Sequence, residues 1–214
     1  MGNRGKGCRG YTAPGATRFA LKTRGISGTI GDMRKLIQQY AKDLTSGRLS
    51  SGYEHSWRVY HLTREIGEGL EYDDDVLHAA CFLHDIEMSS GHPKSSADRA
   101  DAILRETGFT PDKIPLVIEA ILNHMPEGDP QSMEAKLLFD ANLLDSIGAV
   151  GFARLSIGAF IWFNYKTMEE ILEYAKKEIS FAEKLHFPKS RELAQDKLRF
   201  SKFAMEQFAK ELHL

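Results

Sequence analysis

Histidine and aspartate side chains recur in the middle of the chain at positions where they could bind a metal ion. Eight histidines occur in 214 residues, and five of them lie between His55 and His92. His84 is followed directly by Asp85, and His124 comes later in the chain. Neutral imidazole and ionised carboxylate both donate lone pairs to divalent cations. This set of residue types therefore indicates metal chemistry.

Helical periodicity directs three of these histidines toward the interior. Each ends or begins an apolar stripe at helical spacing, namely His55 with Val59, Leu62 and Ile66, His84 with Leu77 and Cys81, and His124 with Val117, Ala120 and Ile121. A buried imidazole needs a polar partner, and a buried carboxylate such as Asp85 is costly unless it is paired or bound to metal. A shared cation would satisfy all four groups.

The order of these motifs resembles that of the HD-domain metal-dependent phosphohydrolases, in particular the small stand-alone bacterial and archaeal type. The resemblance covers about residues 33–165 and depends on HSWRV, ACFLHDIE, ILNH and FDANLLDSIGAVGFAR. In that family a histidine, the His-Asp doublet and a distant aspartate hold the metal. The resemblance therefore implies His55, His84 and Asp85 as metal ligands, together with an acid from the last motif.

The identity of that last acid is open, because the chain departs from the commoner pattern here. Related proteins often read Asp-Ala-Asp where this chain reads Asp140-Ala141-Asn142, so the ligand falls on Asp140 or is replaced by Asn142. At 100° per residue, Asp140 lies about 60–80° from the centre of the apolar face and Asn142 more than about 120° away. The periodicity favours Asp140 as the metal ligand. Asp145 lies near the same face and could contact a ligand or substrate, cap the helix or form an ion pair.

Three further residues could complete the site. Several HD proteins bind two metals, so His92, which we expect in a loop before Pro93, and His124 could bind a second ion or the substrate. Arg58 lies one helical turn after His55, where the family often has arginine, and could offset charge that develops on a phosphoryl group. Arg154 and Lys94 are weaker candidates for the same role. The remaining histidines are interpreted as surface or structural residues: His61, His78, His186 and His213.

Apolar residues recur at helical spacing from Asp32 onward, and no window alternates as a strand does. The sequence therefore predicts an all-α fold, which the resemblance makes an HD-domain helical bundle with additional C-terminal helices. The expected segments are 33–45, 52–68, 74–86, 96–107, 112–124, 133–163 with a break near Gly148 or Gly151, 168–185 and 190–212. Thr167 and Glu170 predict a capping box.

Charge divides the chain into two parts. Residues 1–31 hold eight glycines, six basic residues and no acid, and we interpret them as a flexible basic extension before a single domain over residues 32–214. That domain carries 22 basic and 30 acidic residues, so its net charge is 22 − 30 = −8, and a stable nucleic-acid complex is not expected.

Cys8 and Cys81 indicate free thiols in a reducing compartment. No apolar run is long enough to span a bilayer, and we expect a cytoplasmic protein.

The function that these features favour is metal-dependent hydrolysis of a phosphate ester or anhydride in a small phosphorylated substrate, with nucleotides among the candidates. One or two divalent cations would activate a water, Asp85 or an adjacent acid would accept its proton, and Arg58 would compensate charge. The mixed ligand set suits manganese, iron, cobalt, nickel or zinc better than magnesium. The alternatives are a di-iron oxygenase, which needs both His92 and His124 as ligands, and a ligand-binding regulatory module with weakened catalysis. The substrate, the metal and the oligomeric state stay open.

Overall fold

The computed structural model describes residues 29–88 and 92–212. In these ranges the chain forms nine α-helices, two short 3-10 helices and no strand, which confirms the all-α prediction. The helices are α1 (Ile30–Leu44), α2 (Tyr53–Ile66), α3 (Asp74–Leu83), α4 (His92–Glu106), α5 (Ile114–Leu122), α6 (Met133–Asp145), α7 (Gly148–Ile161), α8 (Met168–Ser180) and α9 (Pro188–Leu212). Of the predicted extension over residues 1–31, residues 1–28 lie outside the described ranges. Helix α1 begins two residues before the expected boundary at 32.

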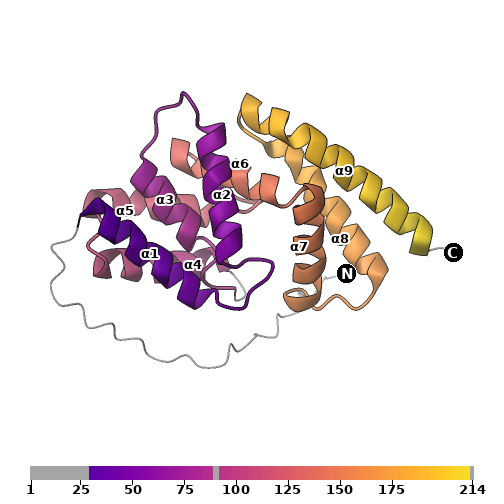
Figure 1. Cartoon of the computed structure of the whole chain (residues 1–214), viewed down its shortest axis with the longest axis horizontal. Coiled ribbons are helices and arrows are strands. Elements are labelled where there is room, and N and C mark those ends of the chain that lie inside the picture. The colour runs from indigo at the N-terminus through magenta and orange to yellow at the C-terminus, as the bar shows by residue number, and fades with distance from the viewer. Residues whose placement is uncertain (1–28, 89–91, 213–214) are drawn as a thin grey trace, which may run out of the picture.

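The helices form two groups on either side of α6 (Figure 1). Helices α1 to α5 lie on one side, where α6 packs against α2, α3 and α5, and α7 to α9 form a layer on the other side. The main core includes Leu77, Phe82 and Phe139, each at most 1% exposed. A smaller apolar cluster around Leu155 and Met205 lies within the α7–α9 layer. The metal-binding candidates therefore belong to the first group and to α6.

Helix α6 is the central helix of the fold and is buried on nearly all of its sides. Its N-terminus is capped by Ser132, whose hydroxyl accepts the N–H of Ala135 at 3.1 Å. Every residue from Glu134 to Asp145 except Lys136 is buried. The polar side chains on this helix must therefore find partners inside the protein.

A sharp turn joins α6 to α7 and directs α7 back toward the core. The axes of the two helices differ by 85°. Gly148 has a φ of 81°, a conformation that glycine adopts at little cost, and its N–H donates to the hydroxyl of Ser201 at 2.8 Å. A Cβ at Gly151 would lie 2.3 Å from the carbonyl carbon of Ser146, so this close approach also requires glycine. The predicted break near Gly148 or Gly151 is confirmed.

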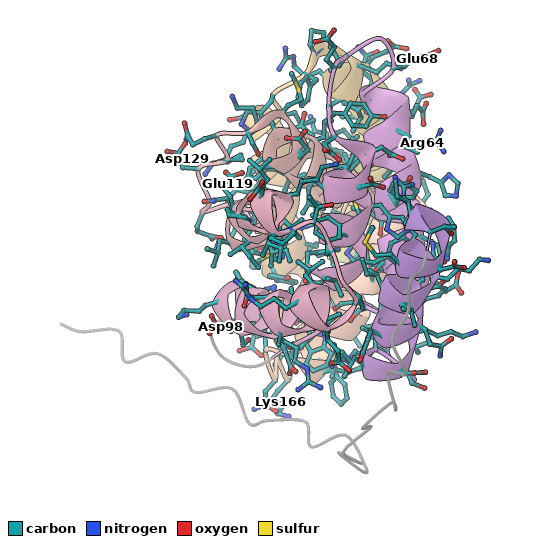
Figure 2. The ribbon with its side chains drawn as sticks, turned by 90° about the vertical axis from the view of Figure 1, so that its left-hand side faces the viewer. Arg64, Glu68, Asp98, Glu119, Asp129 and Lys166 are labelled. Atoms are coloured by element: carbon teal, nitrogen blue, oxygen red, sulfur yellow. The ribbon has the colours of Figure 1, made fainter. Side chains whose placement is uncertain are left out.

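No single helix in the described ranges is long and apolar enough to span a membrane, although the bent pair α6 and α7 passes the same test by length and composition. Charged side chains point outward at the edge of the molecule, as Figure 2 shows for Asp98 on α4 and for Lys166 before α8. The predicted capping box is present at the start of α8, where Thr167 and Glu170 bond each other's backbone.

The surroundings of His92 differ from the sequence interpretation, whereas those of His78 agree with a structural role. His92 is the first residue of α4 and not a loop residue, because the helix begins four residues earlier than expected. His78, interpreted as a surface or structural residue, is only 2% exposed. Its ring packs edge-on against Tyr60, and its Nε2 lies 3.1 Å from the amide nitrogen of Gln38. His78 therefore has a structural role within the core.

Candidate metal centre

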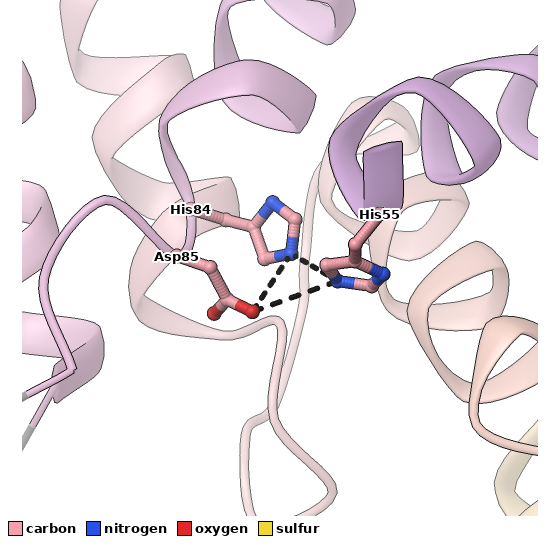
Figure 3. A group of neighbouring side chains, drawn as sticks. All are labelled: His55, His84 and Asp85. Atoms are coloured by element: carbon pink, nitrogen blue, oxygen red, sulfur yellow. Dashed lines mark hydrogen bonds and ion pairs between the residues drawn. The ribbon is translucent and has the colours of Figure 1, made fainter. Parts of the chain in front are cut away.

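Three buried side chains from α2 and the end of α3 converge on one point (Figure 3). The Nε2 atoms of His55 and His84 lie 3.0 Å apart, and Oδ2 of Asp85 lies 3.5 Å from the first and 3.6 Å from the second. His55 is carried by α2, whereas His84 and Asp85 follow directly after the last residue of α3. These three donors form a group that could hold a single metal ion.

The hydrogen bonds on the far side of each ring determine which nitrogen carries the proton. Nδ1 of His84 donates to the carbonyl of Cys81 at 2.9 Å, and Nδ1 of His55 donates to the Asp145 carboxylate at 2.7 Å. These oxygens only accept, so each neutral ring keeps its proton on Nδ1 and presents a lone pair on Nε2. Two lone pairs and a carboxylate oxygen thus face one another, which is unfavourable without a cation between them. The donor set fits a divalent metal.

Burial keeps these imidazoles neutral. It lowers the pKa of His84 to about 3, despite the opposing effect of Asp85. Burial also lowers the pKa of His55, and the charge of Arg154 adds to this effect. For Asp85, burial would raise the pKa, and a charged His84 together with N–H bonds from His124 and His92 would lower it well below its usual value. With the rings neutral and their lone pairs directed inward, a bound cation would take over this role and keep Asp85 ionised. The site therefore combines neutral imidazoles with an ionised carboxylate, as metal ligation requires.

A second group of donors shares Asp85 with the first. Oδ1 of Asp85 lies 3.3 Å from Nε2 of His92 and 3.3 Å from Nε2 of His124, and the two Nε2 atoms are 3.3 Å apart. Nδ1 of His124 donates to the carbonyl of Ile121 at 2.6 Å, so its lone pair also faces the group. The three residues could hold an ion. The two carboxylate oxygens of Asp85 thus point to different groups.

Asp145 contacts the centre from behind His55 and joins it to two arginines. Besides accepting from His55, its carboxylate accepts from Nε of Arg58 at 2.8 Å and from Nη1 of Arg154 at 2.8 Å. Burial would raise the pKa of Asp145, but its hydrogen bonds to His55 and Arg58 and the charge of Arg154 reverse the shift and lower the pKa. Asp145 thereby fixes both the orientation and the tautomer of His55.

Asp140, which the periodicity favours as a metal ligand, lies away from the converging donors. Its carboxylate accepts the backbone N–H groups of His186 and Phe187 at 2.9 and 3.0 Å, and Nδ1 of His186 lies 2.8 Å from Oδ1. It belongs to neither group of potential ligands among the described residues. The physical reason is that α6 is buried all round, so pointing toward the apolar side does not mean pointing toward the metal centre. Asp140 instead anchors the segment before α9.

Asn142 lies in the wall of a cavity next to the centre. Its amide nitrogen donates to the carbonyl of His124 at 3.3 Å. The cavity measures about 200 Å³, and its wall also includes Asp85, His92 and Arg154. Asn142, disfavoured by the periodicity, is thus closer to the candidate ligands than Asp140.

Sequence reasoning missed Arg48, which holds the His-Asp turn in place. Its Nη1 and Nη2 donate to the carbonyls of Asp85 at 2.9 Å and Ile86 at 3.2 Å. These carbonyls follow the end of α3, where a cation is favourable. A lone arginine in a polar loop carries no sequence signal for such a contact. Arg154, a weaker candidate in the sequence, is bound on two sides, because its Nε donates to the Ser50 carbonyl and its Nη1 to Asp145.

Residues 52–147 match the HD domain family. This range runs from the residue before α2 to the turn after α6, and it contains His55, His84, Asp85 and Asp145. The segment that carries the converging donors is therefore an HD domain.

Individual proteins resemble the chain over most of its length. The YpgQ protein of Bacillus subtilis is 28% identical over 202 residues, which cover 84% of this chain and 90% of YpgQ. The fold is shared with the crystal structure of YpgQ in complex with ADP (TM-score 0.65, 22% identity, 86% of this chain and 97% of that one). It is also shared with a protein from Lactobacillus plantarum (TM-score 0.71, 21% identity, 85% and 97%). A predicted HD superfamily hydrolase from an uncultured Thermotogales bacterium is 25% identical, with a TM-score of 0.57 and coverage of 85% and 92%.

Proposed function

We propose that the protein is a metal-dependent phosphohydrolase that cleaves a phosphate ester or anhydride, with nucleotides as the first substrates to test. The observation that carries this proposal is the convergence of the His55 and His84 lone pairs on Asp85 in a buried site beside a cavity. A relative in the HD superfamily is named a hydrolase, and YpgQ forms a complex with ADP. A nucleotide therefore has both a site of suitable chemistry here and a precedent in a relative.

In this proposal His55, His84 and Asp85 hold one divalent cation, and Asp85, His92 and His124 hold a second. A bound cation supplies the activation of water and the polarisation of a phosphoryl oxygen. Asp85 would contribute one oxygen to each group, because its two oxygens face different histidines. Asp85 also lines the cavity, and its carboxylate would act as the base that accepts the proton of the attacking water.

Arg58 and Arg154 have different roles in this proposal. Arg58, expected to compensate charge on the phosphoryl group, is engaged with the Asp145 carboxylate through Nε and Nη2. It therefore acts by positioning Asp145, and through it His55. Arg154 also bonds Asp145 but lines the cavity as well, so its remaining N–H groups are available to a phosphate. We assign the contact with the substrate to Arg154 and the positioning of Asp145 to Arg58.

The proposal is tested by elemental analysis of the purified protein and by a hydrolysis screen with nucleotides and sugar phosphates in the presence of Mn²⁺. The Asp85→Ala variant should lose both bound metal and turnover. The matched control is Asp98→Ala, because Asp98 points outward on α4 (Figure 2) and, within the part of the chain that the structure describes, pairs with Lys94 one turn away. Turnover of Asp85→Ala equal to that of the wild type would overturn the proposal.

A di-iron oxygenase is the second candidate function, and the second donor group favours it. This function requires both His92 and His124 as ligands, and the structure brings these two residues together on Asp85. Iron as the dominant metal, together with turnover that requires oxygen, would support the oxygenase over the phosphohydrolase. A protein that retains no metal and hydrolyses no phosphorylated compound would instead favour a regulatory module.

A further inference from the structure

The cavity extends away from the metal centre to a wall that the proposed chemistry does not use. This wall includes Phe163, Tyr174 and Glu178, and Trp162 also lines the cavity. A second hollow of about 440 Å³ lies beside it. The two share five lining residues, namely Met125, Pro126, Phe163, Tyr174 and Glu178. Together they form one cleft that starts at Asp85 and passes Glu178.

Aromatic rings make up much of this wall and contact one another. The rings of Phe163 and Tyr174 lie 5.1 Å apart, and Tyr165 lies 5.7 Å from Tyr174. The indole N–H of Trp162 donates to the hydroxyl of Ser50 at 2.9 Å. Asn164, between Phe163 and Tyr165 in the chain, has a φ of 55°, a conformation that asparagine tolerates better than most residues. The turn after α7 thus presents several rings to one cleft, as a surface for stacking a planar group.

Glu178 is the acidic side chain common to both parts of the cleft. It is half-buried on α8, and no hydrogen bond to its carboxylate is found within the described residues. Burial raises its pKa to about 7, which Glu127 reinforces and Lys177 opposes. A desolvated carboxyl with unused acceptor capacity gains most from a ligand that donates N–H groups.

We propose that Glu178 is a specificity-determining residue that accepts hydrogen bonds from the N–H edge of a planar ring stacked on the Phe163 and Tyr174 wall. The ring belongs to the part of the substrate that is not cleaved. This inference deepens the proposed function, because it places a phosphate at Asp85 and a heterocycle at the opposite end of the same cleft. Glu127, Glu170 and Glu173 also line the outer part, with Lys177 as the one cation among the described residues of its lining, so a second anionic group at this end is disfavoured.

Nucleoside binding to the metal-loaded protein tests this inference without any turnover. Adenosine is compared with N6,N6-dimethyladenosine, which keeps the ring but lacks the amino N–H donors. By calorimetry the wild type should bind adenosine about tenfold more tightly, as expected when a buried acceptor gains or loses its donor. In Glu178→Leu the ratio of the two affinities should fall to about one. The control Glu169→Leu, an exposed glutamate on the same helix, should keep the wild-type ratio.

A turnover measurement separates failure of this inference from failure of the proposed function. The ratio of kcat/KM for a nucleotide to that for inorganic tripolyphosphate should fall about tenfold in Glu178→Leu and stay constant in Glu169→Leu. Equal affinity of the wild type for both nucleosides would overturn the inference, even when phosphates are hydrolysed. Absence of all phosphate hydrolysis would overturn the proposed function, whereas the affinity ratio would still decide the role of Glu178.

Discussion

At the scale of single residues, the centre depends on the groups behind the ligands as much as on the ligands. The Asp145 carboxylate accepts a hydrogen bond from Nδ1–H of His55, and its negative charge is balanced by Arg58 and Arg154. The arrangement keeps the His55 lone pair directed at Asp85. Metal affinity should therefore respond to residues that touch no metal.

Replacement of Asp145 by asparagine is expected to weaken metal binding by about 10- to 100-fold. The amide can still accept from His55, but it removes the negative charge that two guanidinium groups require. Calorimetric titration with Mn²⁺ measures the effect, with Asp98→Asn as the exposed control. An affinity equal to that of the wild type would contradict the role assigned to Asp145.

Asp140→Ala is expected to do the opposite, with a loss of stability and unchanged metal affinity. The substitution removes a fully buried carboxylate and leaves the backbone N–H groups of His186 and Phe187 without their acceptor, which should lower the free energy of unfolding by about 2–4 kcal/mol. Urea denaturation and Mn²⁺ titration of the same variant check both parts. Loss of the metal with stability intact would show that Asp140 is a ligand after all.

At the level of helices, the sequence predicted most elements well, but the periodicity of α6 did not identify which of its polar residues lies near the metal centre. His55, His84 and His124 lie on amphipathic helices or at their ends, where one apolar stripe points to one core. Helix α6 has no such stripe, because eleven of its thirteen residues are buried. Its periodicity therefore could not distinguish Asp140 from Asn142 or Asp145, and the partners that separate them come from α2, α7 and the segment before α9.

The contact between α1 and α3 makes stability depend on pH through His78. Burial lowers the pKa of His78 from 6.5 to about 4. Since the unfolded chain binds more protons between pH 6.5 and pH 4, the free energy of unfolding falls as pH drops through this window. The contribution is at most about 3 kcal/mol.

His78→Gln should lose this part of the pH dependence, because glutamine does not titrate. Urea denaturation between pH 4 and pH 7 measures the difference from the wild type. His61→Gln is the control, since His61 is an exposed residue of α2. A slope unchanged in His78→Gln would show that the buried imidazole does not contribute.

On the scale of the whole molecule, the metal centre joins parts of the chain that are distant in sequence. Its candidate ligands come from α2, the end of α3, α4 and the residues after α5, and Asp145 connects them to α6 and α7. The family resemblance in the sequence named these ligands. It could not supply Arg48 or the aromatic wall, because both depend on how loops fold back against the core.

Metal loading should therefore stabilise the entire fold. A ligand present at about 100 times its Kd adds about 2.7 kcal/mol to the free energy of unfolding when it binds the folded state alone. Thermal unfolding with Mn²⁺ should show a higher Tm than with a chelator, and Asp85→Ala should show no such difference. An equal Tm of the wild type with Mn²⁺ and with a chelator would argue against a metal site that connects these elements.

The most direct test of the centre is anomalous scattering from crystals grown with Mn²⁺, recorded on both sides of the metal absorption edge. We expect a peak between Nε2 of His55, Nε2 of His84 and Oδ2 of Asp85, and a second peak next to His92 and His124 when two ions bind. A peak beside Asp140 and His186, or none near Asp85 at saturating metal, would contradict this expectation.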